Sequence, residues 1–248
     1  MHGYKRLTYA EVVRKAKRSI CSREHYGNKR VAYRPCQTWL DGDQINLWSY
    51  WQGYQIRDKE SGVDILLVGQ DWGNPGRNPG VIRRIEQIQA DDESSSYDCT
   101  ASPTDRMLTE LFREFGCDIS EADPGLRLFF TNYSLGYRDG SETGGMTKGL
   151  LKEDKELFND LVDAIKPKVI ICLGKMVYEV VSETMAHGFV EQTKQGLPFK
   201  STFPRNESTK VYGVPHCGAR GVSNVGGKDA MIRLWRYIVK DTDLSNAG

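Results

Sequence analysis

The stretch VDILLVGQDWGNPG, residues 63–76, decides how the rest of the sequence is interpreted. Its first seven residues are almost continuously apolar, which is typical of a β-strand buried on both faces. The run breaks at Gly69, and Asp71 follows within a segment rich in Gly and Pro. An acid before such a segment can shape a turn, and it can also carry chemistry. The rest of the chain must distinguish these two roles.

Three further segments have the aliphatic character of buried strands, and helical patterns separate them along the chain. The strand segments are RLFFTN, KVIICLG and KVYGVPH, at residues 127–132, 168–174 and 210–216. The helical patterns cover residues 81–89, 103–115, 150–165, 175–188 and 227–240. Strands that alternate with helices indicate a parallel sheet covered on both faces. We therefore expect an α/β fold with a parallel four-stranded sheet flanked by helices, in a domain spanning residues 63–248.

Residues 1–62 form a basic, aromatic-rich extension that we expect to pack on this domain. Thr8 and Glu11 make a capping box, which predicts a helix to about residue 18, and residues 21–62 look irregular. The first 40 residues hold ten Lys or Arg against two acids, interleaved with four tyrosines. Such a segment can grip phosphates and stack on bases, with Lys29 and Arg30 as candidate DNA contacts. It can equally be a solvated arm or the polar face of a helix.

Composition bears on where the protein is located and on whether it binds a cofactor. No apolar run approaches about 18 residues, and the N-terminus has no secretory signal, so we expect an intracellular protein outside the membrane. The six cysteines form no C-x-x-C pair and read as reduced thiols. The four histidines lack zinc-ligand spacing. We therefore expect neither a metal nor another cofactor.

Polar residues follow the predicted strands at their carboxyl ends, where open α/β sheets bind ligands. Asp71, Asn132 and His216 are the side chains at these ends that can do chemistry. Asp71 can direct a water, Asn132 can read the edge of a planar ring, and His216 can donate to a leaving group. Each also has a structural alternative: a turn residue, a loop cap or a buried, satisfied histidine. One functional site explains these three polar residues more simply than three separate structural roles at the same rim do.

Other motifs of catalysis and nucleotide binding are missing from the sequence. It contains no G-x-G-x-x-G after a strand, no G-x-x-x-x-G-K-[ST] loop and no G-x-S-x-G elbow. A Cys217 nucleophile beside His216 is awkward, because neighbouring residues on a strand point to opposite faces.

Four segments together resemble the uracil-DNA glycosylase superfamily: LLVGQDWG, FFTNYSLGYR, KPKVIICLG and VPHCGARG. They occur in the family's order, and the resemblance covers about residues 63–240. It implies a monofunctional DNA glycosylase that flips a base out of the duplex and hydrolyses its N-glycosidic bond. In that family Asp71 would activate water, Asn132 would read the pyrimidine edge, and His216 would stabilise the departing base.

The resemblance also implies roles around these three residues. The loop of Gln70 and Trp72 would contact the base, and Tyr97 is a candidate to stack on it. Arg220 would enter the duplex or bind phosphate. Some relatives carry an iron–sulfur cluster, but Gly136 stands where one of its cysteines would be. No lysine stands out for cleavage of abasic DNA, and we expect a monomer that needs no protein partner.

Two departures from the family bear on the substrate. Trp72 replaces the usual proline, and Gly73 stands where uracil-specific enzymes have a tyrosine that blocks the 5-position of the base. A glycine leaves room for a 5-substituted pyrimidine, such as a modified cytosine of viral DNA, unless Trp72 refills the space. Defence against phage is then an alternative to DNA repair. Because Cys217 also departs from the family motif, a catalytically silent DNA-binding module remains the rival interpretation. A nucleoside hydrolase fits the basic N-terminal segment less well.

Overall fold

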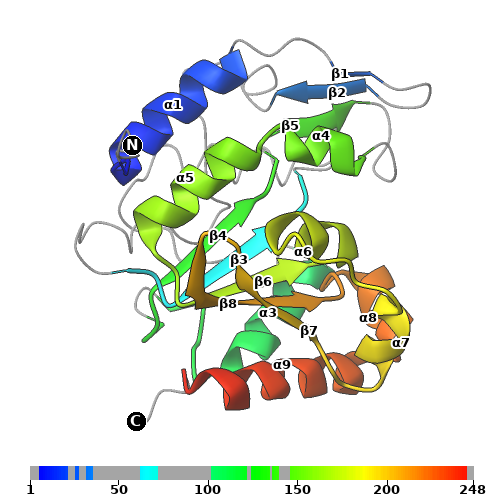
Figure 1. Ribbon diagram of the computed structural model, residues 1–248. Helices are drawn as coiled ribbons and strands as arrows, with labels where there is room; N and C mark the ends of the chain where they lie inside the picture. The colour runs from blue at the N-terminus through cyan, green and yellow to red at the C-terminus, as the bar shows by residue number, and fades with distance from the viewer. Residues whose placement is uncertain are drawn as a thin grey trace.

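The computed structural model describes residues 6–21, 26–27, 32–35, 62–71, 102–121, 124–134, 136–139 and 146–244. Its main sheet has five strands (Figure 1), in the order β4 (Leu128–Asn132), β3 (Ile65–Gly69), β6 (Val169–Leu173), β8 (Asn206–Val214) and β7 (Phe199–Phe203). The strands β3, β4, β6 and β8 are parallel, as the sequence predicted. The α/β class and the four parallel strands are therefore confirmed.

The sheet has a fifth strand that the sequence did not predict, because β7 pairs antiparallel with β8 at its edge. Its sequence, FKSTF, lacks an aliphatic run, and its residues alternate between half-buried and exposed as far as Thr202. It lies at the sheet's edge, where one face and one side need no apolar cover. The strand β8 begins at Asn206, four residues before the predicted start, because β7 pairs with it as far back as Asn206, whereas β6 pairs with it only from Lys210.

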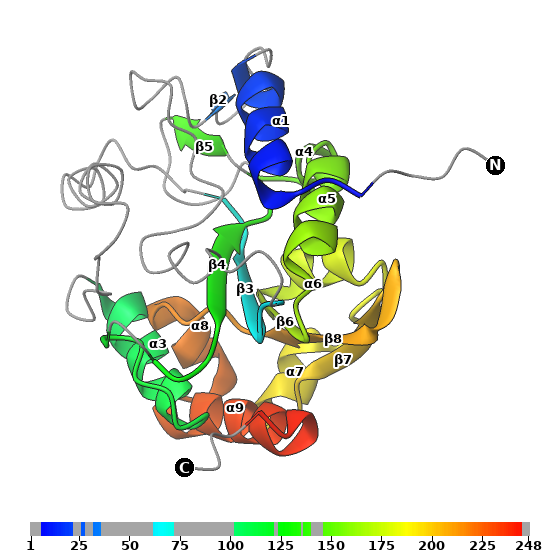
Figure 2. The ribbon, with the colours of Figure 1, turned by 90° about the vertical axis from the view of Figure 1, so that its left-hand side faces the viewer.

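Helices cover both faces of the sheet (Figures 1 and 2). One face packs against α1 (Tyr9–Cys21), α4 (Lys148–Lys152), α5 (Lys155–Ile165) and α6 (Lys175–Val181), with α7 (Phe189–Lys194) beside them. The other face packs against α3 (Pro103–Arg113), α8 (Ala219–Val225) and α9 (Lys228–Thr242). Within β3, Leu66 and Val68 belong to the first core, while Ile65 and Leu67 belong to the second. Burial on both faces is the reason that the central strands read as unbroken apolar runs.

The predicted helix starts are found at two capping residues. In the capping box, the Glu11 amide donates to Thr8 Oγ1 at 3.3 Å, and the Thr8 amide donates to Glu11 Oε2 at 2.8 Å. The helix α3 begins at Pro103, where Ser102 Oγ accepts from the Asp105 amide at 3.2 Å. The helix predicted over residues 81–89 lies outside the described residues.

Two predicted helices are shorter than expected. The helix predicted over residues 150–165 is broken into α4 and α5 at Asp154, which is buried. The helix predicted over residues 175–188 ends at Val181, where the Ser182 hydroxyl bonds back to the carbonyl of Tyr178 at 2.7 Å. The next residue, Glu183, is left-handed with φ of 55°. At the first break Ser134 holds the side chain of Asp154, and beyond the second the carboxylate of Glu179 accepts from the Ala186 amide at 2.9 Å, so contacts outside the helix override the helical pattern.

The N-terminal residues make contacts with the rest of the chain. In α1, Val12 and Ala16 are fully buried in the first core, and Lys15 Nζ lies 2.5 Å from Asp160 Oδ2 of α5. A second sheet joins β1 (Tyr26–Gly27), β2 (Ala32–Pro35) and β5 (Gly136–Asp139). Because β2 pairs antiparallel with β5, an N-terminal strand lies beside the chain that leaves β4. No helix of the described residues is both long and apolar enough to cross a membrane.

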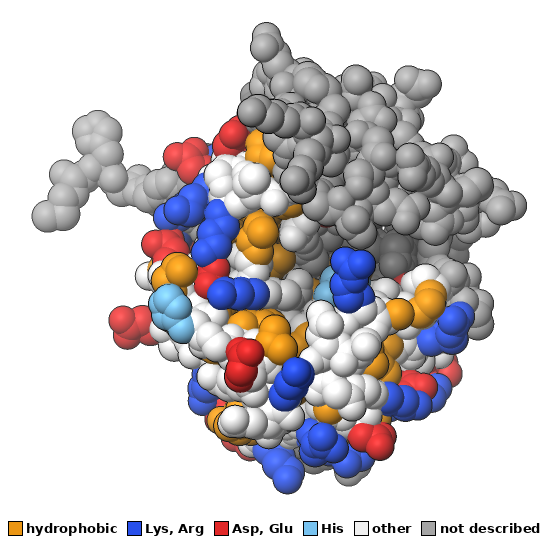
Figure 3. Space-filling model, turned by 90° about the vertical axis from the view of Figure 1, so that its right-hand side faces the viewer, with side chains coloured by type: hydrophobic (Ala, Val, Ile, Leu, Met, Phe, Trp, Pro, Cys, Tyr) orange, Lys and Arg blue, Asp and Glu red, His pale blue; other side chains and the backbone are white. Residues whose placement is uncertain are grey.

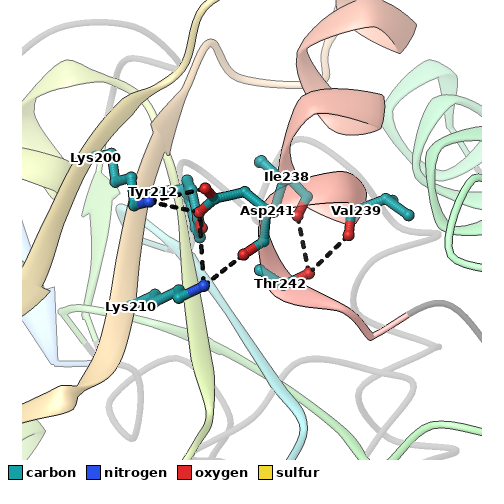
Figure 4. Close-up of polar contacts among 7 residues, drawn as sticks. All are labelled: Lys200, Lys210, Tyr212, Ile238, Val239, Asp241 and Thr242. Carbon is teal, nitrogen blue, oxygen red and sulfur yellow. Dashed lines mark hydrogen bonds and ion pairs between the residues drawn. The ribbon is translucent and has the colours of Figure 1, made fainter.

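A polar cluster fastens the last turn of α9 to the β7–β8 edge (Figure 4). The carboxylate of Asp241 lies 2.7 Å from Lys200 Nζ and accepts a hydrogen bond from the Tyr212 hydroxyl. Lys210 donates to the backbone carbonyl of Asp241. Since Lys210 is the partner of Val169, the first residue of β6, this cluster lies at the amino ends of the parallel strands.

Candidate functional site

The carboxyl ends of the four parallel strands form one rim. Gly69 is the partner of Asn132 on β4, and Leu173 of β6 is the partner of Val214 on β8. Adjacent strands lie about 4.8 Å apart, so β3 and β8 are separated by roughly 10 Å with β6 between them. Asp71, Asn132 and His216, which follow or end three of these strands, are brought to this rim.

Asn132 lies against the backbone of β3. The residue is only 8% exposed, and a Cβ built on Gly69 would stand 2.3 Å from its Oδ1. No side chain larger than hydrogen fits at Gly69 while Asn132 keeps this position. The strand pairing also continues past β4, because the Tyr133 amide donates to the Gly69 carbonyl at 2.9 Å. The amide of Asn132 is therefore held in a fixed place at the rim.

Asp71 and Gln70 follow β3 and are both half-buried. The side-chain amide of Gln70 donates to Asp71 Oδ1 across a long 3.4 Å. The carbonyl of Gln70 accepts from the Ser134 amide at 3.0 Å, so the turn carrying Asp71 is tied to the chain that leaves β4. A half-buried carboxylate in this position can accept a proton from a water or face a developing positive charge.

His216 lies in the turn after β8 and is exposed at the rim. Its Nδ1 accepts a hydrogen bond from the Gly218 amide at 2.9 Å. From this bond we assign the neutral tautomer with the proton on Nε2. Although the residue is exposed at the surface, partial desolvation lowers the pKa of His216 below its ordinary value of 6.5. The ring is thus prepared to donate through Nε2–H.

Glycines allow the His216 turn to fold tightly. A Cβ built on Gly221 would lie 1.8 Å from the carbonyl oxygen of His216. One on Gly218 would lie 3.0 Å from His216 Nδ1 and 3.1 Å from Thr104 Oγ1 of α3. Both glycines therefore belong to the geometry that orients the imidazole.

The middle of the rim, after β6, holds a glycine. Gly174 has φ of 109°, a conformation that disfavours other residues, and its amide donates to the Val214 carbonyl at 2.7 Å. No atom of the described residues lies within 4 Å of a Cβ built there. No role was predicted for Gly174, although its position directly after a buried strand indicates the rim.

Cys217 does not face this rim. It is 1% exposed and packs in the second core, in the same cluster as Trp235 of α9. Burial raises the pKa of its thiol well above the usual range, so it stays a neutral thiol. This agrees with the expectation that Cys217 is no nucleophile. Across the described part of the chain, no three His, Cys, Asp or Glu side chains gather in a way that could hold a metal ion.

Of the three predicted DNA contacts, Arg220 is the one that lies in the described residues. It is exposed in the first turn of α8, four residues after His216. On the face in Figure 3, Lys and Arg side chains are spread among acidic and hydrophobic ones, and no continuous basic patch forms among the residues described there. Five further candidates lie outside the described residues: Lys29, Arg30, Trp72, Gly73 and Tyr97.

Sequence reasoning missed a buried pair directly behind the rim. The hydroxyl of Ser134 donates to Asp154 Oδ2 at 2.5 Å, and both residues are at most 1% exposed. The signal was present, because Asp154 interrupts an otherwise apolar-periodic helix. A charged residue facing the core marks a tertiary partner.

Comparison with known proteins adds no family to this geometry: no protein-family model matches the chain, and no curated protein matches it.

Proposed function

We propose that this protein is a monofunctional DNA glycosylase, which hydrolyses the N-glycosidic bond of a flipped-out pyrimidine and leaves an abasic site. The observation that supports the proposal is the placement of Asp71, Asn132 and His216 at the carboxyl ends of three parallel strands, with His216 Nδ1 accepting from the Gly218 amide so that Nε2–H is assigned as the donor. These are a carboxylate, an amide and a neutral hydrogen-bond donor. Breaking a bond between a sugar and a base needs these three kinds of group.

The reaction develops negative charge on the base and positive charge on the sugar, and His216 and Asp71 suit these two charges. The bond between the base nitrogen and C1′ breaks with its electron pair going to the base. His216 Nε2–H stabilises the resulting anion, and the carboxylate of Asp71 stabilises the positive sugar. A water then bonds to C1′ while one of its protons passes to Asp71. The base anion takes up a proton from solvent and Asp71 returns its proton to solvent, so the products are a free base and an abasic sugar, and the reaction needs no cofactor.

Asn132 would select the base. Its amide offers one donor and one acceptor, which suit the ring edge of a pyrimidine. The sequence places Gly73 rather than a tyrosine beside the base, and the rim has a glycine at Gly174. We therefore propose uracil or a 5-substituted pyrimidine, such as a modified cytosine of phage DNA, as the substrate. The role is then base-excision repair or defence against phage, inside the cell and as a monomer.

DNA is the substrate class that the charge distribution favours. The excess of basic residues lies in the first 40 residues. The second sheet brings residues 32–35 of that segment beside β5, which starts four residues after Asn132. Cations near the rim would bind phosphates on either side of the flipped nucleotide.

The test is release of free base from a panel of otherwise identical DNA duplexes. They carry uracil, mismatched thymine, 5-hydroxymethylcytosine or its glucosylated form at one position. We expect release from at least one, and Asp71→Asn should reduce the rate at least about a hundredfold while DNA affinity is kept. Asp241→Asn is the matched control, because it makes the same chemical change at the opposite end of the sheet. Release from the uracil duplex alone would contradict the proposal that the site accepts 5-substituted pyrimidines.

A catalytically silent DNA-binding module is the second candidate. Cys217 favours it, because this residue departs from the family motif after the histidine and its side chain is buried in the second core. No base release from any duplex, together with salt-dependent DNA binding that Asp71→Asn leaves unchanged, would support this candidate.

A further inference from the structure

The buried pair of Ser134 and Asp154 lies directly behind the base-reading end of the rim. Ser134 is fully buried, Asp154 is 1% exposed, and the Ser134 hydroxyl donates to Asp154 Oδ2 at 2.5 Å. Ser134 is only two residues beyond Asn132. Burying a carboxylate is costly unless its partners compensate, so this contact constrains both elements that provide it.

The chain breaks a helix to place Asp154 there. The helix α4 ends at Lys152, and the Asp154 amide closes a turn on the Leu151 carbonyl at 3.0 Å. The Asp154 carbonyl then accepts the first hydrogen bond of α5, from the Phe158 amide at 2.9 Å. The carboxylate thus lies at the N-terminus of α5, where the helix dipole favours negative charge.

The pair connects to the site through main-chain hydrogen bonds. The Ser134 amide donates to the carbonyl of Gln70, the residue before Asp71. The Tyr133 amide donates to Gly69, against which the Asn132 side chain lies. Segment 132–134 is therefore tied to the β3 turn by its backbone and to α5 by the Ser134 side chain.

The ring of Tyr133 reinforces the contact with α5. It packs on Phe158 with centroids 4.6 Å apart, and the residue is 2% exposed. Burial raises the pKa of Tyr133, and the nearby charge of Asp154 raises it further, so the phenol stays neutral. Two consecutive residues after Asn132 are thus anchored on the same helix.

We propose that Asp154 is a positioning residue that sets the selectivity for the base. It acts through Ser134 on Asn132 and on the turn that carries Asp71. The inference rests on the proposed function, and it assigns base discrimination to a residue buried behind the site. A loosened segment 132–134 lets the Asn132 amide shift, and a misplacement of about 1 Å at a reacting centre can cost about a hundredfold in rate.

The first experiment compares base release by Ser134→Ala, Asp154→Ala and Asp154→Asn. The rate ratio between the preferred pyrimidine and its nearest competitor should fall about ten- to a hundredfold in both alanine variants. Asp154→Asn should restore most of the ratio, because its amide oxygen can still accept from Ser134. The matched control is Thr209→Val, which removes a buried hydroxyl bonded to the Pro167 carbonyl at 2.8 Å, at the other end of the sheet. It should lower stability and leave the ratio unchanged.

A double-mutant cycle separates positioning from a general loss of stability. Ser134→Ala combined with Asn132→Ala should discriminate no worse than Asn132→Ala alone, because both act on one amide. Combined with His216→Ala, it should be additive. Equal losses of discrimination in Ser134→Ala and Thr209→Val, or full additivity with Asn132→Ala, would overturn the inference.

Amide hydrogen exchange tests the pair without using activity. Ser134→Ala should speed exchange at the backbone amides of positions 133 and 134, relative to the rest of the sheet, and Thr209→Val should not. If the wild type releases no base, the proposed function fails, and this exchange experiment alone decides whether the pair holds the segment. If base is released but neither discrimination nor exchange changes, only the positioning role fails.

Discussion

The backbone amide of Gly218 donates a hydrogen bond to Nδ1 of His216 across 2.9 Å. This bond fixes both the orientation of the imidazole and the nitrogen that carries its proton. In the proposed reaction the ring would therefore meet the departing base through Nε2–H, as a neutral group. A neutral donor stabilises an anion without forming an ion pair with the carboxylate of Asp71.

Replacing His216 tests this donor. His216→Ala should lower the rate constant for base release about a hundred- to a thousandfold, the usual loss when one transition-state donor is removed. His216→Gln should retain more activity than His216→Asn, because the longer amide reaches the place of Nε2 and the shorter one that of Nδ1. Single-turnover rates measure this. An alanine variant as fast as wild type would remove His216 from the mechanism.

The activity should fall at acid pH. Protonating Nδ1 breaks the bond from Gly218, and desolvation lowers the pKa of His216 below 6.5. Because the folded-state pKa lies below the unfolded one, the folded chain binds fewer protons between the two values. Folding stability and base release should therefore both decline as pH falls below about 6.5. Rate–pH profiles of wild type and His216→Gln measure the part that His216 contributes.

Gly69→Ala should disable base reading. Its Cβ would stand 2.3 Å from Asn132 Oδ1, so the amide must move. The matched control is Gly62→Ala, whose Cβ would stand 2.7 Å from the Lys166 carbonyl oxygen, just before the amino end of β3 and so at the opposite end of the sheet from the rim. Both variants should lose about 1–3 kcal/mol of stability from overpacking. Only Gly69→Ala should lose base release beyond what its stability explains, as denaturation curves and rates together will show.

The basic N-terminal segment should govern the salt dependence of DNA binding. If Lys29 and Arg30 each contact a phosphate, Lys29→Gln with Arg30→Gln should reduce the slope of log affinity against log salt by about 2. The sequence of the DNA should not matter for this loss. Titrations at several salt concentrations measure the slope, and an unchanged slope would remove these residues from the interface.

Asp64 should make the fold sensitive to acid. Burial raises the pKa of its carboxyl, but the contact with Lys168 at 2.8 Å and the bonds from Arg127 outweigh this and leave the pKa below its ordinary value. A depressed carboxyl pKa contributes stability above the unfolded value near 4, which is lost as pH falls through the folded value. Asp64→Asn should cost about 1.5–3 kcal/mol at pH 7, the scale of charged hydrogen bonds. Urea unfolding of both proteins at pH 7 and pH 3 will show whether the difference disappears in acid.

The sequence predicted those features that local pattern determines. The run at residues 63–69 is buried on both faces, and capping by Thr8 and Ser102 depends on neighbours three residues away. The strand β7 was not predicted from the sequence, because a strand at the edge of a sheet needs little apolar surface. The ends of α4 and α6 were not predicted, because they depend on side-chain contacts. Asp154 accepts from the Ser134 hydroxyl, and Glu179 accepts from the Ala186 amide. Those partners are distant in sequence or reached only through a turn, and periodicity contains no information about them.

The cluster around Asp241 has a practical consequence for the measurements above. It anchors the end of α9 at the amino ends of the parallel strands, whereas Asn132 and His216 lie at the carboxyl ends. The last described residue, Leu244, follows three residues after Asp241. A biotin or fluorophore attached after residue 244 would therefore tether the protein with its rim directed away from the support. Surface-based binding assays can use such a tether without blocking the site.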